Sequence, residues 1–176
     1  MEMLRERIKG LEKKIVEMIR NSQDNVAIAE RLHRWTRALM ITANPAELPQ
    51  VLVQELKQQF MIPQAGIRVW GVDEPFKALA FAQGASDDAR SLATSLPVPY
   101  CGVNAGFEAA RWLDDPATVA SMAMVPLRQA GSDVAFGLLV VASPDPTRYS
   151  ADMGTDFLVR IGEIASAGLS RLLPSP

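Results

Sequence analysis

Two consecutive apolar runs in the last third of the chain constrain its fold more than any other segment. They cover residues 121–127 and 134–142, and a short polar turn, Gly131-Ser132-Asp133, separates them. Their composition and spacing predict two antiparallel strands joined by a hairpin. The second run is almost entirely apolar, which predicts a central strand covered on both faces. A punctuated loop and an amphipathic helix at residues 151–173 are expected to follow.

The middle of the chain supplies the other expected elements. Asn44-Pro45-Ala46-Glu47 is typical of a helix start, and apolar residues at helical spacing continue to Phe60. Residues 65–72 are rich in β-formers and predict a strand with Arg68 and Trp70 on the same face. A second strand is expected at residues 76–81 and a short capped helix at 89–96. Residues 98–104 fit a loop or a short strand, and residues 107–113 fit a helical turn or a strand.

The N-terminal segment carries a narrow apolar stripe. Its members are spaced by 4, 3, 4 and 3 residues, and charged residues occupy most other positions: Leu4, Ile8, Leu11, Ile15 and Met18. This spacing is that of a coiled-coil seam. A seam on so small a chain needs a partner, and a second copy of the chain is the simplest one. These five residues are therefore the predicted interface of a homodimer.

The heptad pattern breaks after Met18. Ser22 and Asn25 stand where apolar residues would continue the seam, and a second stripe starts at Ile28. One long helix with a local change of phase explains this, and so do two helices that meet near residues 21–24. The continuous helix is favoured because no Pro or Gly lies between Leu11 and Thr42. We place the domain boundary here, with a dimerisation helix at residues 1–27 and a globular domain at 28–176.

Composition excludes several classes of function. The net charge is −2, so no global field recruits nucleic acid. One cysteine, Cys101, rules out an internal disulfide and a multi-cysteine zinc site, and it fits a reducing compartment. No stretch is long and apolar enough to span a bilayer, and the N-terminus lacks the apolar core of a signal peptide. We therefore expect a cytoplasmic protein with no membrane partner, and we identify no cofactor.

No residue set in the chain matches a catalytic or metal-binding motif. The single histidine, His33, lies between arginines on the N-terminal helix and is interpreted as a surface or interface residue. Asp145, Asp152 and Asp156 form an apparent carboxylate cluster, but the first suits a turn and the others suit a helix start. No catalytic residue and no metal ligand are assigned.

Aromatic and sulfur-containing residues are the best candidates for a ligand pocket. Each fits a core position as well as a pocket position, but as a group they suggest a cavity, because buried Trp and Tyr each carry a polar atom that needs a partner. The predicted pocket residues are Trp70, Tyr100, Cys101, Trp112 and Met122. Cys101 also has an inert, buried interpretation, since no basic residue lies close to it in sequence to lower the pKa of its thiol.

Four segments of the chain resemble the bacterial proteins called domain of unknown function 484. They are Glu30–Trp35, Cys101-Gly102, Val125-Pro126-Leu127 and, most specifically, residues 143–158 with the sequence Ser-Pro-Asp-Pro-Thr-Arg-Tyr-Ser-Ala-Asp-Met-Gly-Thr-Asp-Phe-Leu. The resemblance covers about residue 28 to the end. It implies an α+β, GAF-like fold, with a central antiparallel sheet, N- and C-terminal helices on one face and a loop-covered pocket on the other. It implies no activity or ligand of its own.

These observations lead to three hypotheses about function. The first is a GAF-like module that senses a small molecule, acts as a dimer in signalling or regulation, and has no catalytic activity. The second is a structural adaptor without a ligand that binds an unidentified protein partner. The third is a redox enzyme that uses Cys101. Related domains that reduce methionine sulfoxide use several cysteines, and this chain has one, which argues against the third.

Overall fold

The computed structural model describes residues 2–149 and 156–174, and its chain divides into two compact units, Met1–Arg34 and Trp35–Pro176. Helix α1 (Glu2–Ile41) is continuous through the polar break in its apolar stripe. This confirms the single-helix interpretation. The absence of Pro and Gly between Leu11 and Thr42 explains why the hydrogen-bonded ladder is not interrupted. The boundary expected after residue 27 stays a prediction.

A single antiparallel sheet forms the centre of the second unit. Its strand order is β1-β4-β3-β2. The strands are β1 (Gln64–Val69), β2 (Tyr100–Val103), β3 (Ser121–Arg128) and β4 (Ala135–Ser143). Strands β3 and β4 form the expected hairpin, and every residue of β4 is buried between its two neighbouring strands and the layers above and below. The α+β fold class and the central position of the second apolar run are both confirmed.

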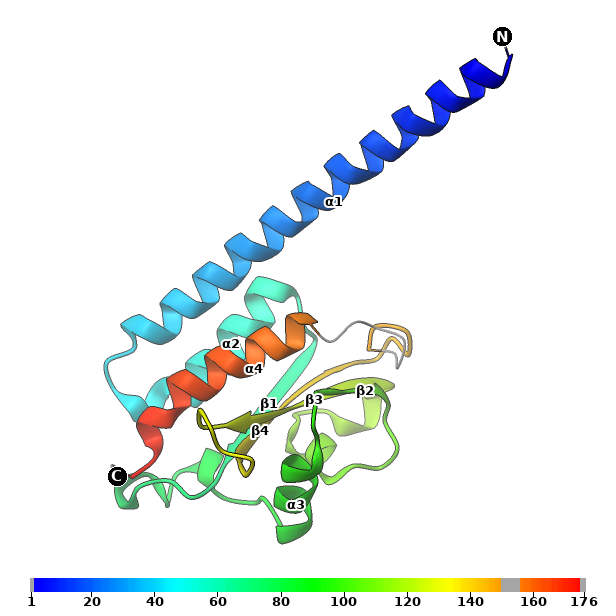
Figure 1. Ribbon diagram of the computed structural model, residues 1–176. Helices are drawn as coiled ribbons and strands as arrows, with labels where there is room; N and C mark the ends of the chain where they lie inside the picture. The colour runs from blue at the N-terminus through cyan, green and yellow to red at the C-terminus, as the bar shows by residue number, and fades with distance from the viewer. Residues whose placement is uncertain (1, 150–155, 175–176) are drawn as a thin grey trace. The chain divides into compact units, whose positions relative to one another are not determined.

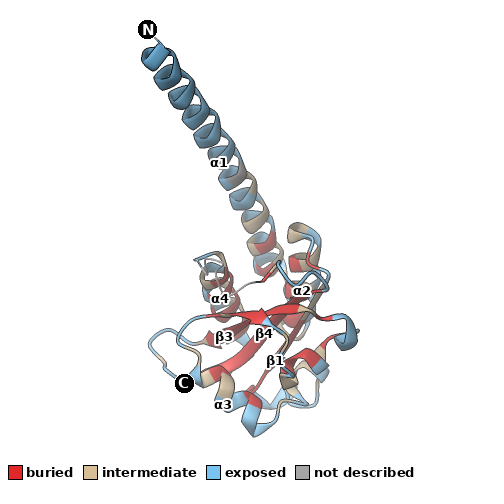
Figure 2. Ribbon diagram, turned by 90° about the vertical axis from the view of Figure 1, so that its right-hand side faces the viewer, coloured by how far each residue is buried: buried red, intermediate tan, exposed pale blue. Residues whose placement is uncertain are grey.

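Helices α2 (Leu48–Phe60) and α4 (Asp156–Leu169) cover one face of this sheet (Figure 1). Asn44 caps the short turn before α2, where its side chain accepts a hydrogen bond from the N–H of Ala46. Trp35, near the end of α1, is fully buried, and its Nε1 donates to the carbonyl of Leu52 at 3.0 Å. The buried positions run through the strands and the inner sides of these helices (Figure 2).

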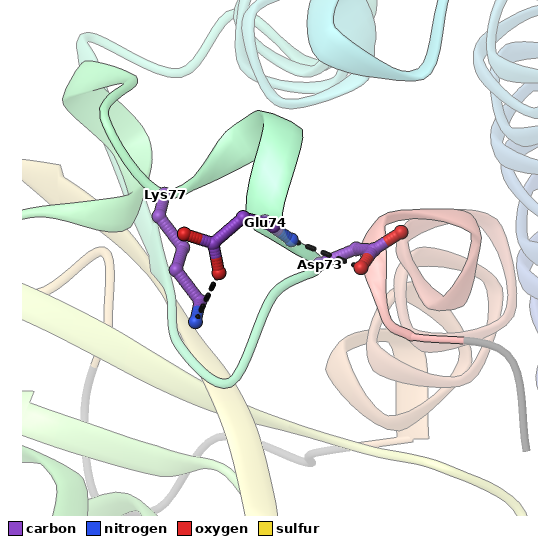
Figure 3. Close-up of polar contacts among 3 residues, drawn as sticks. All are labelled: Asp73, Glu74 and Lys77. Atoms are coloured by element: carbon purple, nitrogen blue, oxygen red, sulfur yellow. Dashed lines mark hydrogen bonds and ion pairs between the residues drawn. The ribbon is translucent and has the colours of Figure 1, made fainter.

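The opposite face is covered by α3 (Asp87–Ser95) and several single turns of 3₁₀ helix (Figure 1). The expected strand at residues 76–81 is wrong. Pro75 removes a backbone donor, and Asp73 accepts from the N–H of Glu74 at 2.9 Å, which starts a 3₁₀ turn instead. Lys77 then pairs with Glu74 at 2.8 Å across this exposed turn (Figure 3).

The structure decides between the alternatives that the sequence left open for residues 98–104 and 107–113. Residues 98–104 contain the edge strand β2, which pairs with the first half of β3. Residues 107–113 contain a 3₁₀ helix, Glu108–Trp112. The expected last helix is present as α4 with a further 3₁₀ turn at Ser170–Leu172, while its expected start at residues 151–155 lies outside the described residues.

Candidate functional site

Four of the five predicted pocket residues lie on the face covered by α3 and the short turns. Trp70 and Met122 are buried in one apolar cluster there, and Tyr100 and Trp112 pack against it half-buried. Tyr100 stands beside Met124 in the β2–β3 register, and its ring meets Phe107 edge-to-face at 5.1 Å. The sequence therefore identified residues that share one place in the fold. Whether they bind a ligand stays a proposal.

The structure does not bring Cys101 into this cluster. It is paired with Ala123 and points to the other face of the sheet, because neighbouring residues of a strand alternate between faces. The thiol is buried, and burial raises its pKa. A reactive cysteine needs a lowered pKa, so this environment favours an inert thiol.

The three aromatic residues of the predicted pocket differ in whether their polar atom has a hydrogen-bond partner. Trp70 Nε1 donates to the carbonyl of Ala135 at 2.8 Å, and the Tyr100 hydroxyl donates to the carbonyl of Val103 at 3.1 Å. Trp112 Nε1 is buried and has no acceptor in the described structure. The expectation that such atoms need partners thus singles out Trp112.

Arg68 is the neighbour of Trp112 and was not among the predicted pocket residues. Its guanidinium lies over the Trp112 ring, with Cζ 5.5 Å from the ring centroid. Its Nη1 donates to the carbonyl of Ile67 at 2.8 Å, while its Nε is buried without an acceptor. Burial lowers the pKa of this guanidinium. The available signal was the predicted alternation of β1, which placed a charged residue on the same face as Trp70.

A separate surface groove of about 830 Å³ lies along α4. It is bounded by the end of β3, the β3–β4 turn and the loop before β2, and it includes Pro99, Pro126, Gly162 and Ser166. Beyond Met124 no strand in the described part of the chain pairs with β3 on this side, and the N–H of Arg128 donates to Ser166 Oγ at 3.1 Å. The predicted pocket residues do not line this groove.

The other candidate polar residues have structural roles. Asp145 Oδ1 accepts from the N–H and hydroxyl of Thr147 at 2.9 and 2.7 Å, which is ordinary turn chemistry. Asp156 lies in the first turn of α4, and Asp152 lies outside the described residues. His33 is exposed on α1. Among the described residues, no group of three or more His, Cys, Asp or Glu side chains could hold a metal ion.

The apolar stripe of α1 is exposed along its whole length. Its five members are between 53% and 69% exposed in the single chain: Leu4, Ile8, Leu11, Ile15 and Met18. Such a row of large apolar side chains marks an interaction surface more often than a solvated one. None of the helices in the described part of the chain combines the length and apolarity that a membrane crossing requires.

A protein-family model described as "Protein of unknown function, DUF484" matches residues 1–173. The chain belongs to this family. The match includes the N-terminal helix, and so it extends beyond the segments that carried the resemblance in the sequence. No curated protein sequence matches the chain.

Solved GAF domains share the fold of this chain. The GAF domain of a putative sensor histidine kinase from Pseudomonas syringae pv. tomato superposes with a TM-score of 0.55 at 18% identity, over 87% of this chain and 92% of that one. The GAF domain of a phosphoenolpyruvate-protein phosphotransferase from Coxiella burnetii gives 0.58 at 13% identity, over 83% and 94%. A free methionine-R-sulfoxide reductase from Neisseria meningitidis, solved with its substrate, gives 0.52 at 15%, over 81% and 88%. These likenesses confirm the GAF-like fold.

Proposed function

We propose that this member of the family is a cytoplasmic, non-catalytic sensing module that binds a small molecule on the face of the sheet covered by α3 and the short turns. The observation that carries the proposal is the aromatic cluster around Trp70, Tyr100, Trp112 and Met122, which lies on that face of a GAF-like fold. Irregular turns cover this face, and such segments are better able than packed helices to open around a ligand.

Thermal unfolding of the full chain against a panel of nucleotides, amino acids and carboxylic acids tests this function. A specific compound at 100 times its Kd adds about 2.7 kcal/mol of stability, which is a shift of several degrees for a domain of this size. Native mass spectrometry of freshly purified protein is the parallel measurement, because a tightly held metabolite adds a discrete mass. A panel that gives no shift, together with an unliganded mass, would contradict the sensing role.

The module is proposed to act as a homodimer through the stripe Leu4, Ile8, Leu11, Ile15 and Met18. Its exposure in the single chain supports this, since pairing two copies would remove most of this apolar surface from water. Light scattering should report a dimer for the full chain and a monomer for the double variant Leu11→Asp, Ile15→Asp. Lys13→Asp is the matched control, because residue 13 lies outside the stripe. A double variant that stays dimeric would move the interface elsewhere.

A ligand-free adaptor is the second candidate function. The groove along α4 favours it, because its volume and its apolar and small lining residues suit a peptide or helix of another protein. The thermal-shift panel distinguishes the two functions, since an adaptor should respond to no small molecule. The redox function is disfavoured by the buried Cys101, whose thiol pKa is raised by burial.

A further inference from the structure

Two side-chain N–H groups on the loop-covered face lack an acceptor, and they belong to neighbouring residues. Arg68 Nε and Trp112 Nε1 are both buried without a partner in the described structure. The guanidinium of Arg68 rests on the Trp112 ring, with Cζ 5.5 Å from its centroid. Buried donors are almost always paired in folded proteins. Two neighbouring donors without acceptors therefore call for a common explanation.

Among the described residues, no carboxylate compensates the charge of Arg68. No described Asp or Glu forms an ion pair with it, and its one conventional hydrogen bond is to the neighbouring carbonyl of Ile67. An arginine does not lose its proton in proteins, so the charge stays in the partly buried site. A negatively charged acceptor would satisfy the charge and both donors together.

We propose that Arg68 and Trp112 bind the carboxylate group of a small ligand. A carboxylate offers two oxygen acceptors and a negative charge, so one such group can serve both N–H donors and the guanidinium charge. The apolar cluster beside them, with Trp70 and Met122, would hold the non-polar part of the same molecule. This proposal rests on the sensing function proposed above and specifies the chemical class of its ligand.

The pair is covered by an irregular turn at Gly84, which a ligand entering from solvent could displace. Arg68 and Trp112 are each only partly buried as whole residues, although their unpaired nitrogen atoms are covered. Gly84 is a neighbour of Arg68, and a Cβ built at Gly84 would be in ordinary van der Waals contact with Arg68 Nε at 3.8 Å. The covering backbone at this glycine has a φ of +87°, a conformation that larger residues rarely adopt. A ligand would therefore displace an irregular turn instead of a regular element.

Indole N–H resonances of the ¹⁵N-labelled chain of 176 residues test this site with sodium acetate as the probe. The chain has three tryptophans, and Trp35 and Trp70 already donate to backbone carbonyls. Acetate should move the Trp112 resonance downfield in a saturable way and leave the other two in place. In Arg68→Met the apparent Kd should rise at least tenfold. Titration with sodium chloride at equal ionic strength controls for general salt effects, and inorganic phosphate distinguishes a carboxylate from another oxyanion.

Several results would overturn the proposal. They are a Trp112 resonance that acetate does not move, one that acetate moves equally in Arg68→Met, and one that phosphate moves more strongly than acetate. A metabolite that stabilises wild type and Arg68→Met equally would preserve the sensing function and place its ligand elsewhere. Stability without ligand provides a second readout. Trp112→Phe removes an unpaired donor and should leave the Tm unchanged or higher, whereas the matched variant Trp35→Phe loses a buried hydrogen bond and should lower it.

A different observation, the charge pattern beside the α1 stripe, bears on how two copies would pair. With Ile8 and Ile15 at heptad position a, the residues Leu4, Leu11 and Met18 occupy position d. Within parallel coiled coils, β-branched residues at a with leucine at d favour two strands, while the charges at e and g set the orientation. Arg7 is then at g and Glu12 at e, so a parallel in-register pair brings each Arg7 opposite the partner's Glu12.

The antiparallel alternative has less favourable charge contacts. It brings g positions of the two helices together, and these are Arg7 and Lys14, both positive. The best antiparallel register places Arg5 of one copy opposite Glu12 of the other, both at e, and these two attract each other. The same register places Arg7 opposite Lys14 at g, and their repulsion offsets this gain. We infer that α1 pairs with a second copy in parallel and in register. This inference rests on the proposed dimer.

Disulfide formation by Leu4→Cys in the full chain tests the orientation. In the parallel pair the two introduced cysteines face each other, whereas in that antiparallel register they are about 16 Å apart along the axis at 1.5 Å per residue, beyond disulfide reach. Mild oxidation should give a covalent dimer on a non-reducing gel, and wild type, with only the buried Cys101, should not. Glu12→Arg should weaken the dimer at least tenfold, and adding Arg7→Glu should restore it.

The possible failures can be told apart. A wild-type chain that is monomeric by light scattering contradicts the dimer itself. A wild-type dimer whose Leu4→Cys variant stays dimeric but does not cross-link contradicts the parallel orientation alone. Dimers of Glu12→Arg as tight as wild type would show that the charge pair does not select the partner.

Discussion

The two faces of the sheet are covered in different ways. On one face, α2 and α4 are regular helices, Trp35 is fully buried with its N–H paired, and Gly162 lets α4 approach β3 closely. On the other face, α3 is nine residues long, the rest of the cover is made of short 3₁₀ helices, and two buried side-chain N–H donors lack acceptors among the described residues. The first face is a completed core. The second has polar groups that packing alone does not satisfy, and for this reason the proposed ligand site lies there.

The largest expected effect is on the helical face. Trp35→Ala removes a fully buried indole and should lower the free energy of unfolding by about 3–5 kcal/mol, the usual cost of such a truncation. Trp112→Ala, at a partly buried position on the other face, should cost less than half as much. Urea unfolding of the full chain measures both. Equal losses would mean that the two faces contribute alike to stability, and the contrast between them would fail.

Arg128 provides the next test, because it holds α3 in place by polar contacts. Its Nη2 donates to the carbonyls of Ala93, Thr94 and Leu96 at 3.2, 3.0 and 2.7 Å, where α3 ends. Arg128→Met should cost about 2 kcal/mol, typical of a lost charged hydrogen bond, and should speed amide hydrogen exchange in α3. Arg160→Met, on the exposed side of α4, is the control and should change stability by about 0.5 kcal/mol or less.

Two glycines of α4 test how tightly the helical face is packed. A Cβ at Gly162 would lie 2.8 Å from Val125 Cγ1, whereas a Cβ at Gly168 would have its nearest neighbour, Leu39 Cδ1, at 4.0 Å. Gly162→Ala should therefore destabilise by about 1 kcal/mol, since overpacking against a stiff valine exceeds the gain in helix propensity. Gly168→Ala should instead stabilise by up to about 1 kcal/mol. Stabilisation by both substitutions, in urea titrations, would show that the α4–β3 contact can relax.

Much of this fold was readable from the sequence because its core elements have strong periodic patterns. The hairpin, the buried β4, the capped start before α2 and the continuous α1 each follow from local composition and spacing. The strand expected at residues 76–81 was wrong because apolar content outweighed Pro75 and the capping Asp73 in the interpretation. Strand β2 stayed open because four residues after two prolines carry too short a pattern to identify.

Only part of the candidate site could be predicted from the sequence. Alternation along β1 correctly put Trp70 on the loop-covered face, and the need of buried aromatic residues for polar partners pointed toward Trp112. The face of Cys101 depends on the register of β2 against β3, which the sequence does not contain. Arg68 was missed as a site residue because nothing local shows that its guanidinium folds over a ring 44 positions later in the chain.

The smallest expected effect concerns a polar contact that ties two parts of the loop-covered face together. Glu108 accepts hydrogen bonds from the N–H of Ser86 at 3.0 Å and from its hydroxyl, and these bonds lower the pKa of the Glu108 carboxyl. A lowered pKa in the folded state adds stability above the ordinary carboxyl pKa, and that stability is lost as pH falls through the folded value. Because the Glu108 carboxyl is largely exposed, its contribution to stability should be below about 1 kcal/mol.

Urea unfolding from pH 7 to pH 3 should therefore show Glu108→Gln slightly less stable than wild type at neutral pH, with a difference in stability, or gap, that closes in acid. A gap that does not change with pH would mean that the charge of Glu108 does not contribute to holding this face together.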